Sequence, residues 1–130
     1  MAAADRQLQL VSGLFLKLSH SGQLIPNEQE PATVADGART ISLGKINWEI
    51  LQRGLADIIE VPDVLTMQAL QHYFRYANLK VEPTGALSLG AILAAPERFY
   101  GKRVCCIVSG GNVDAAIYAA ILKQEGERCE

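Results

Sequence analysis

The chain has little of what marks a membrane-bound, secreted or nucleic-acid-binding protein. Its 130 residues carry 12 Lys and Arg against 14 Asp and Glu, for a net charge of −2. With no basic cluster either, nothing favours nucleic acid or an anionic membrane as a partner. No apolar run approaches the roughly 20 residues of a spanning helix. The amino end, MAAADRQLQL, has an acidic residue before its first basic one and no continuous apolar core, unlike a secretory signal.

Cysteine is also scarce. Three are present, and two of them, Cys105 and Cys106, are neighbours whose side chains would point to opposite faces of a strand. That makes a poor disulfide set and suits small core residues in a reducing compartment, so we expect a cytoplasmic protein. The content of 49% hydrophobic and 20% charged residues indicates one globular domain over residues 1–130.

The hydrophobic pattern predicts helices alternating with two short strands. Residues 22–44 are rich in Pro and Gly and are expected to be mostly loop, and residues 125–130 are expected to fray. Short apolar runs at 57–62 and 102–109 are predicted to be strands. Helical spacing predicts five helices, at about residues 5–20, 45–56, 63–77, 84–99 and 112–124.

This order indicates an α/β fold with helices covering a mainly parallel sheet. Two strands are fewer than the about four to six of a typical sheet, so part of the sheet is missing from the pattern. The buried face of helix 63–77 is expected to be Leu65, Ala69, Leu70, Tyr73 and Phe74.

The helix predicted at 84–99 begins with small residues. Small side chains there either allow close backbone packing or make room for a flat ligand, and the sequence leaves both open. They are Thr84, Gly85, Ala86, Ser88, Gly90 and Ala91.

The predicted strand 102–109 runs into Ser109, Gly110, Gly111 and Asn112 and then into a helix. Glycines let a ligand approach the backbone, and a helix start offers unpaired N–H groups, so the motif fits an anion or cofactor cradle. It also fits an ordinary strand-to-helix turn with Ser109 or Asn112 as the helix cap. By itself the motif favours the turn.

Three blocks together carry a more specific signal. TVADGARTISLG, VEPTGALSLGAILA and GKRVCCIVSGGNVD resemble the carboxy-terminal half of the pyridoxal-phosphate-dependent serine/threonine dehydratases and serine racemases. These are fold-type II relatives of tryptophan synthase β chains. The blocks have the family's order and approximate spacing, and the resemblance runs over about residues 22–122. It implies a fragment of the fold-type II large domain, a partial parallel sheet flanked by helices.

The resemblance also implies a cofactor-binding role for the SGGN motif. Ser109 matches the serine whose hydroxyl meets the pyridine nitrogen of the cofactor. A neutral hydroxyl suits an unprotonated ring nitrogen, which favours elimination of a β-hydroxyl over transamination. Gly110 and Gly111 would give the ring access, and Asn112 would fix the turn.

Two further residues are implied in the same way. Glu82 matches the glutamate of the family's EPTG block, close to the cofactor, and is equally well explained as an acidic residue at a helix N-terminus. Gly37 lies in an ADG sequence that resembles the loop near the cofactor's other edge. Within it, Asp36 is more simply a turn residue.

The residue that holds the cofactor in this family has no match. The family's lysine sits in a Ser-x-Lys-x-Arg-Gly-Ala context, and a glycine-rich loop cradles the phosphate; neither pattern occurs here. Without a buried lysine, abstraction of the α-proton has no base, so we expect no catalytic residue in the chain. The lysines fall at exposed helix positions or element starts: Lys17, Lys45, Lys80, Lys102 and Lys123.

No metal site is expected. Relatives that bind a divalent cation use an acidic cluster just upstream of the segment matching SGQLIPN. Here that region, LVSGLFLKLSH, has no carboxylate, and Asp5 is the nearest. His20 and His72 are far apart in sequence, without ligand partners nearby.

The resemblance therefore implies part of a serine/threonine dehydratase (ammonia-lyase), which converts a 2-amino-3-hydroxy acid to a 2-oxo acid and ammonia. We expect the chain to be inactive alone, and to associate with a missing amino-terminal half or with itself. The alternatives are a non-catalytic phosphate- or cofactor-binding module, and the second half of a split enzyme or of a racemase. The residues do not choose between amino acid substrates.

Overall fold

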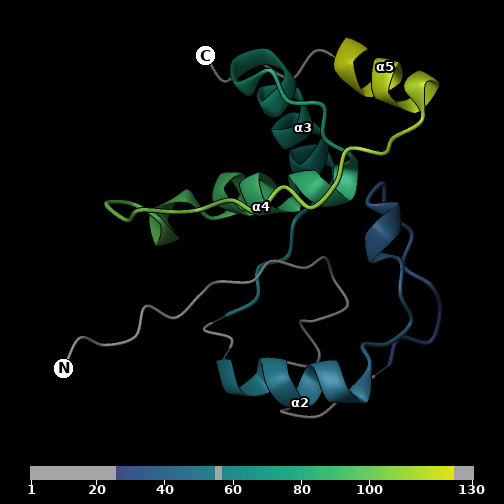
Figure 1. Cartoon of the computed structure of the whole chain (residues 1–130), viewed down its shortest axis with the longest axis vertical. Helices are drawn as coiled ribbons and strands as arrows, with labels where there is room; N and C mark the ends of the chain where they lie inside the picture. The colour runs from purple at the N-terminus through teal and green to yellow at the C-terminus, as the bar shows by residue number, and fades with distance from the viewer. Residues whose placement is uncertain (1–25, 55–56, 125–130) are drawn as a thin grey trace.

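The structure is a computed structural model that describes residues 26–54 and 57–124. The predicted helix 5–20 and the fraying end at 125–130 lie outside these residues. Two short 3-10 turns, η1 (Asp36–Ala38) and η2 (Pro96–Arg98), accompany the α-helices. The α-helices are α2 (Lys45–Gly54), α3 (Asp63–Ala77), α4 (Pro83–Ala94) and α5 (Ala115–Lys123) (Figure 1).

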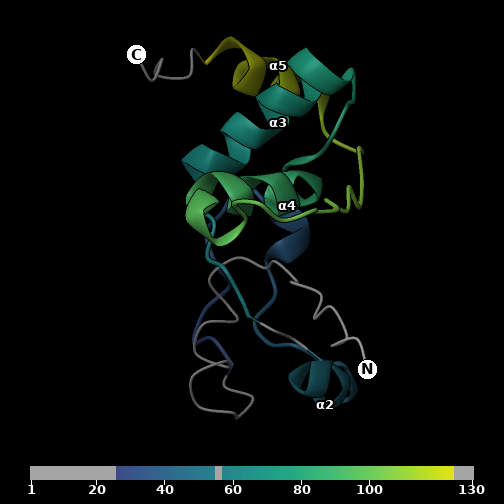
Figure 2. The same cartoon turned by 90° about the vertical axis from the view of Figure 1, so that its left-hand side faces the viewer.

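The predicted α/β fold with a partial parallel sheet is wrong for the described residues, which contain no β-strand. Both predicted strands, 57–62 and 102–109, are non-helical segments that pair with no other strand there. A strand needs a neighbour that takes up its backbone N–H and C=O groups. The second segment instead runs beside α4, whose backbone groups are bonded within the helix (Figures 1 and 2). What the structure describes is an all-helical fragment.

Four of the five predicted helices, those at 45–56, 63–77, 84–99 and 112–124, are confirmed within the described residues, with changes at their ends. The 3.6-residue pattern of α3 buries Ala69, Leu70 and Tyr73, whereas Phe74, expected inside, is 46% exposed. The helix ends at Ala77, and the following Asn78 has a φ of 58°, the left-handed conformation found after many helix ends.

The end of α4 and the start of α5 differ from the predicted positions, and in each case a nearby residue explains the difference. Helix α4 ends at Ala94 because Pro96 has no backbone N–H with which to continue it. Helix α5 begins at Ala115, and its cap is Asp114, whose carboxylate accepts hydrogen bonds from two N–H groups of the first turn. The prediction that Ser109 or Asn112 caps this helix is therefore wrong.

The core forms where α3 and α4 pack across each other, with α5 beside α3 and α2 lying apart from all three (Figures 1 and 2). Helix α4 contributes to two apolar clusters. One joins it to α3 and α5, and the other joins it to η1 and the segment before α3. The first contains Ala69, Leu70, Tyr73, Val81, Ala86, Tyr118 and Ile121, and the second Ala35, Ala38, Ile59, Val61, Leu87 and Ala91.

Small residues of α4 serve this close packing. A Cβ at Gly90 would lie 2.7 Å from Cγ1 of Val61, and one at Gly85 would lie 2.7 Å from the backbone oxygen of Gly110. Of the two explanations that the sequence left open, backbone packing is the one these positions show.

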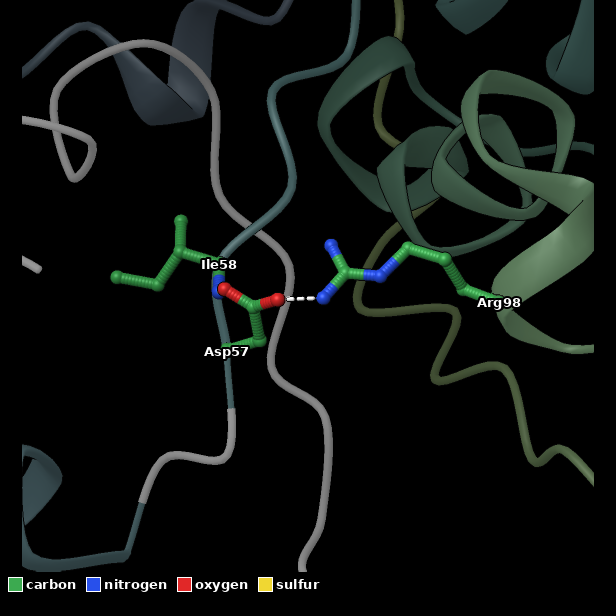
Figure 3. Close-up of polar contacts among 3 residues, drawn as sticks. All are labelled: Asp57, Ile58 and Arg98. Carbon is green, nitrogen blue, oxygen red and sulfur yellow. Dashed lines mark hydrogen bonds and ion pairs between the residues drawn. The ribbon is translucent and has the colours of Figure 1, made fainter.

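An ion pair adds a link across the same region. The Arg98 guanidinium, in η2, donates to the Asp57 carboxylate, which precedes α3 (Figure 3). Both side chains are partly exposed, so the pair contributes only about 0–1 kcal/mol. No helix in the described part of the chain has the length and apolar character needed to cross a membrane.

Candidate cofactor-binding site

The start of α4 lies between two loops that are distant from each other in sequence. On one side, the Gly37 N–H donates to Oγ1 of Thr84 at 3.0 Å. On the other, the Glu82 N–H donates to the Gly110 carbonyl at 3.1 Å, and the Asn112 N–H donates to Oε2 of Glu82 at 3.0 Å. The predicted ADG, EPTG and SGGN blocks thus meet at one end of one helix.

Glu82 occupies the N-cap position of α4, and Pro83 follows at the first helical position, where its missing N–H costs nothing. Its side chain makes no capping hydrogen bond to α4. The carboxylate accepts instead from Asn112, 30 residues along the chain. The position agrees with an acidic residue at a helix N-terminus, but the hydrogen bond goes to the SGGN loop.

Gly110 and Gly111 of this loop lie against the residues that lead into α4. A Cβ at Gly110 would lie 2.6 Å from Oε1 of Glu82, and one at Gly111 would lie 2.6 Å from the backbone oxygen of Lys80. Real Cβ atoms essentially never come so close; at Gly111 the obstacle is backbone, so a larger side chain there would displace the loop, whereas at Gly110 it would displace the Glu82 carboxylate. That these glycines give a cofactor ring access stays a prediction.

Ser109 is exposed at the start of the loop. The segment before it is tied to α4 by Ser88, whose hydroxyl donates to the Ile107 carbonyl at 3.0 Å. The Tyr73 hydroxyl lies 3.5 Å from Oγ of Ser88, and burial raises the pKa of that phenol above its ordinary value. Tyr73 is therefore a neutral phenol beside Ser88, the residue that holds the segment before Ser109.

Sequence reasoning gave Thr84 and Ser88 no polar role. The signal was present, because the two hydroxyls are four residues apart and so lie on one face of an otherwise apolar helix. Each holds a separate piece of the site, Thr84 at Gly37 and Ser88 at Ile107.

The ADG loop is fixed from its other side by Asp63 at the start of α3. This carboxylate accepts from the Thr33 hydroxyl and from the Val34 N–H, and the Arg39 guanidinium donates to the Thr33 carbonyl. Asp36 turns back on the following residue, since its carboxylate accepts from the Gly37 N–H at 2.8 Å, as expected of a turn residue. An open cavity of about 520 Å³ beside the loop contains none of the predicted site residues.

The described residues supply no buried lysine and no metal cluster. The four lysines that the structure describes, Lys45, Lys80, Lys102 and Lys123, are exposed. Within residues 26–54 and 57–124 no three His, Cys, Asp or Glu side chains are grouped to hold an ion. Lys17, His20 and Asp5 lie outside the described residues, so the absence of a metal site stays a prediction.

Comparison with known proteins gives close relatives, although no family model matches the chain. The L-threo-3-hydroxyaspartate ammonia-lyase of a Pseudomonas species is 41% identical over 93 residues, 72% of this chain and 29% of that protein. The serine racemase of Schizosaccharomyces pombe is 42% identical over 94 residues, with the same coverage. Among solved structures, a threonine deaminase from T.th. has a TM-score of 0.72 and 31% identity, covering 82% of this chain and 37% of that one.

Over this stretch, the chain belongs to the pyridoxal-phosphate-dependent serine/threonine dehydratase and serine racemase family of fold type II. It spans about 29% of the length of these curated relatives. Members of the family depend on pyridoxal phosphate.

Proposed function

We propose that the chain forms the ring-binding part of a pyridoxal-phosphate-dependent ammonia-lyase, which converts a 2-amino-3-hydroxy acid to a 2-oxo acid and ammonia. The observation that carries this proposal is the meeting of the three family blocks at the start of α4, through the contacts of Thr84 and Glu82 with the two loops. The identity with an L-threo-3-hydroxyaspartate ammonia-lyase supports a hydroxy amino acid as substrate.

The described residues fit one edge of the cofactor. Ser109 offers an exposed hydroxyl next to a loop that Glu82 holds, and that hydroxyl can donate to an unprotonated pyridine nitrogen. Gly110, Gly111 and Asn112 would line the same edge, and Gly37 the loop opposite. Pyridoxal phosphate supplies the electron sink that elimination of the β-hydroxyl needs.

The described residues do not fit the Schiff-base end of the cofactor, because none of their lysines is buried. We therefore assign no catalytic residue to the chain and expect it to be inactive alone. An amino-terminal half would supply the lysine and the phosphate loop, as in a split enzyme. Cys105 and Cys106 are free thiols, in keeping with a reducing, cytoplasmic location.

Racemisation is the second candidate reaction, favoured by the 42% identity with a serine racemase. Both reactions begin with loss of the α-proton, so the same ring-binding residues serve either. A non-catalytic binding module remains the outcome if an added amino-terminal half restores no turnover.

The test uses amide NMR of the whole chain with pyridoxal phosphate. We expect the cofactor to shift the amide signals of residues 109–112, and Ser109→Ala to abolish that shift. The exposed Ser42 gives the matched control, and Ser42→Ala should change nothing. A cofactor that leaves these signals unmoved, or moves them equally in Ser109→Ala, would contradict the proposal.

Borohydride treatment of the same mixture tests the missing lysine. We expect intact-mass analysis to show no stoichiometric adduct. Turnover of L-serine, L-threonine or 3-hydroxyaspartate should stay at the level of the free cofactor. A single adduct on one lysine would show that the chain has a Schiff-base site of its own.

A further inference from the structure

We infer that Glu82 is a positioning residue, which fixes the backbone of residues 109–112 and through it Ser109, and does not contact the cofactor itself. The purpose of this positioning rests on the proposed function. The positioning can be measured without any cofactor.

Two hydrogen bonds join Glu82 to the loop, one from its backbone and one to its side chain. The Glu82 N–H donates to the Gly110 carbonyl at 3.1 Å, and the Asn112 N–H donates to Oε2 at 3.0 Å. They bracket Gly111, so the loop is held on both sides of this glycine. Ser109 directly precedes the first of the held residues.

The carboxylate is also packed against the loop. From the Cβ position at Gly110, the distances to Oε1, Cδ and Oε2 of Glu82 are 2.6, 2.7 and 2.8 Å. All three atoms of the carboxylate therefore face the Gly110 backbone. A group in this position acts on a ligand through the loop.

A carboxylate suits this role better than a neutral group. A hydrogen bond from a backbone N–H to an ionised acceptor is shorter and roughly twice as strong as one between neutral groups. Since the side chain makes no capping bond to α4, its contribution goes to the loop.

The experiment measures hydrogen exchange of the Asn112 amide in the full chain by NMR. Glu82→Ala should speed this exchange about tenfold or more, because a hydrogen bond to a charged group is lost. Glu82→Gln keeps a side-chain oxygen as acceptor but loses the charge, so it should restore part of the protection. Glu97→Ala, at an exposed acidic residue of η2, is the matched control and should leave the exchange unchanged.

A second pair of variants tests the close packing of the Glu82 carboxylate against Gly110. Gly110→Ala drives a Cβ into the carboxylate and should also expose the Asn112 amide. In the double variant with Glu82→Ala that obstacle is gone, so adding the methyl group should cost no further protection. Circular dichroism checks that the helices persist in each variant.

Unchanged Asn112 exchange in Glu82→Ala, or failure of Glu82→Gln to restore protection, would overturn the inference. These measurements contain no pyridoxal phosphate. A chain that holds its loop as described and yet ignores the cofactor would contradict the proposed function alone.

Discussion

Gly90 lies where α4 meets the segment that leads into α3. Its missing side chain allows this approach, since a Cβ would stand 2.7 Å from Cγ1 of Val61 and 3.6 Å from the Leu65 carbonyl oxygen. We expect Gly90→Ala to lower the free energy of unfolding by about 1–3 kcal/mol through overpacking, although alanine is the better helix former. Urea denaturation measures the change.

The control for this prediction is Gly54, the last residue of α2, where a Cβ would meet no described atom within 4 Å. There the helix propensity of alanine acts without a clash, so Gly54→Ala should be neutral or stabilise by up to about 1 kcal/mol. If both substitutions stabilise the chain, the close packing at Gly90 is wrong.

Tyr118 places a hydroxyl in the core, where among the described residues it comes near the Val81 backbone but makes no hydrogen bond of good geometry. A buried polar atom without a partner costs about 1–3 kcal/mol, so Tyr118→Phe should raise the free energy of unfolding by about 1 kcal/mol. Tyr100→Phe is the control, because that ring is 91% exposed. A loss of stability in Tyr118→Phe would show that the hydroxyl has a partner after all.

The same burial makes stability depend on alkaline pH. Desolvation raises the pKa of Tyr118 and of Tyr73 above the ordinary 10.0, which they regain on unfolding. The neutral phenols therefore contribute stability that is complete below pH 10 and is lost as pH rises through the higher, folded-state values. We expect Tyr118→Phe to flatten this decline in urea unfolding between about pH 9 and about pH 11.

At the scale of elements, α5 depends on one cap. Oδ1 of Asp114 accepts from the N–H groups of Ala116 and Ile117 at 2.8 and 3.1 Å. Asp114→Ala should lower the free energy of unfolding by about 1 kcal/mol, and Asp114→Ser should keep most of it. Equal losses in both variants, measured in urea, would show that the charge rather than the cap matters.

The helices were predictable because each carries its own periodic pattern and stop signal. The run Leu65 to Tyr73 needed no knowledge of the rest of the chain, and the start of α4, predicted at Thr84, lies one residue earlier at Pro83. The strands were not predictable in this way, because a strand is completed by a neighbour that lies elsewhere. The apolar run at 104–108 is typical of a buried strand, yet in the described structure Ile107 is 70% exposed.

The site was predictable as a set of blocks but not as a set of contacts. Resemblance gave Gly37, Glu82 and the SGGN loop. It could not show that Thr84 holds the first loop, or that the loop glycines pack against the residues leading into α4. These contacts join residues 28 to 47 positions apart in the chain, and no local pattern encodes such a distance.

At the scale of the molecule, residues 104–108 present apolar side chains that the described structure does not cover. Val104, Ile107 and Val108 are 45%, 70% and 38% exposed on backbone without a strand partner among the described residues. Such a segment favours self-association or association with another chain. We expect the purified chain to associate with rising concentration, and Ile107→Lys to reduce this in sedimentation velocity.

Ile46 provides the control for that prediction. It is 73% exposed on α2, which lies apart from α3, α4 and α5 (Figure 1). Ile46→Lys adds the same charge and should leave the association unchanged. If it acts as strongly as Ile107→Lys, net charge and not the segment governs association.

The crossing of α3 and α4 has a consequence for the order in which the chain folds. The two helices are adjacent in sequence, so their contact closes a short loop and can form early, whereas the hydrogen bonds from Gly37 and Asn112 to the start of α4 close long ones. Truncation of Leu70 should then slow refolding, while Glu82→Ala should mainly speed unfolding. The contacts that hold the ADG and SGGN loops to α4 would be the last to form and the first to break.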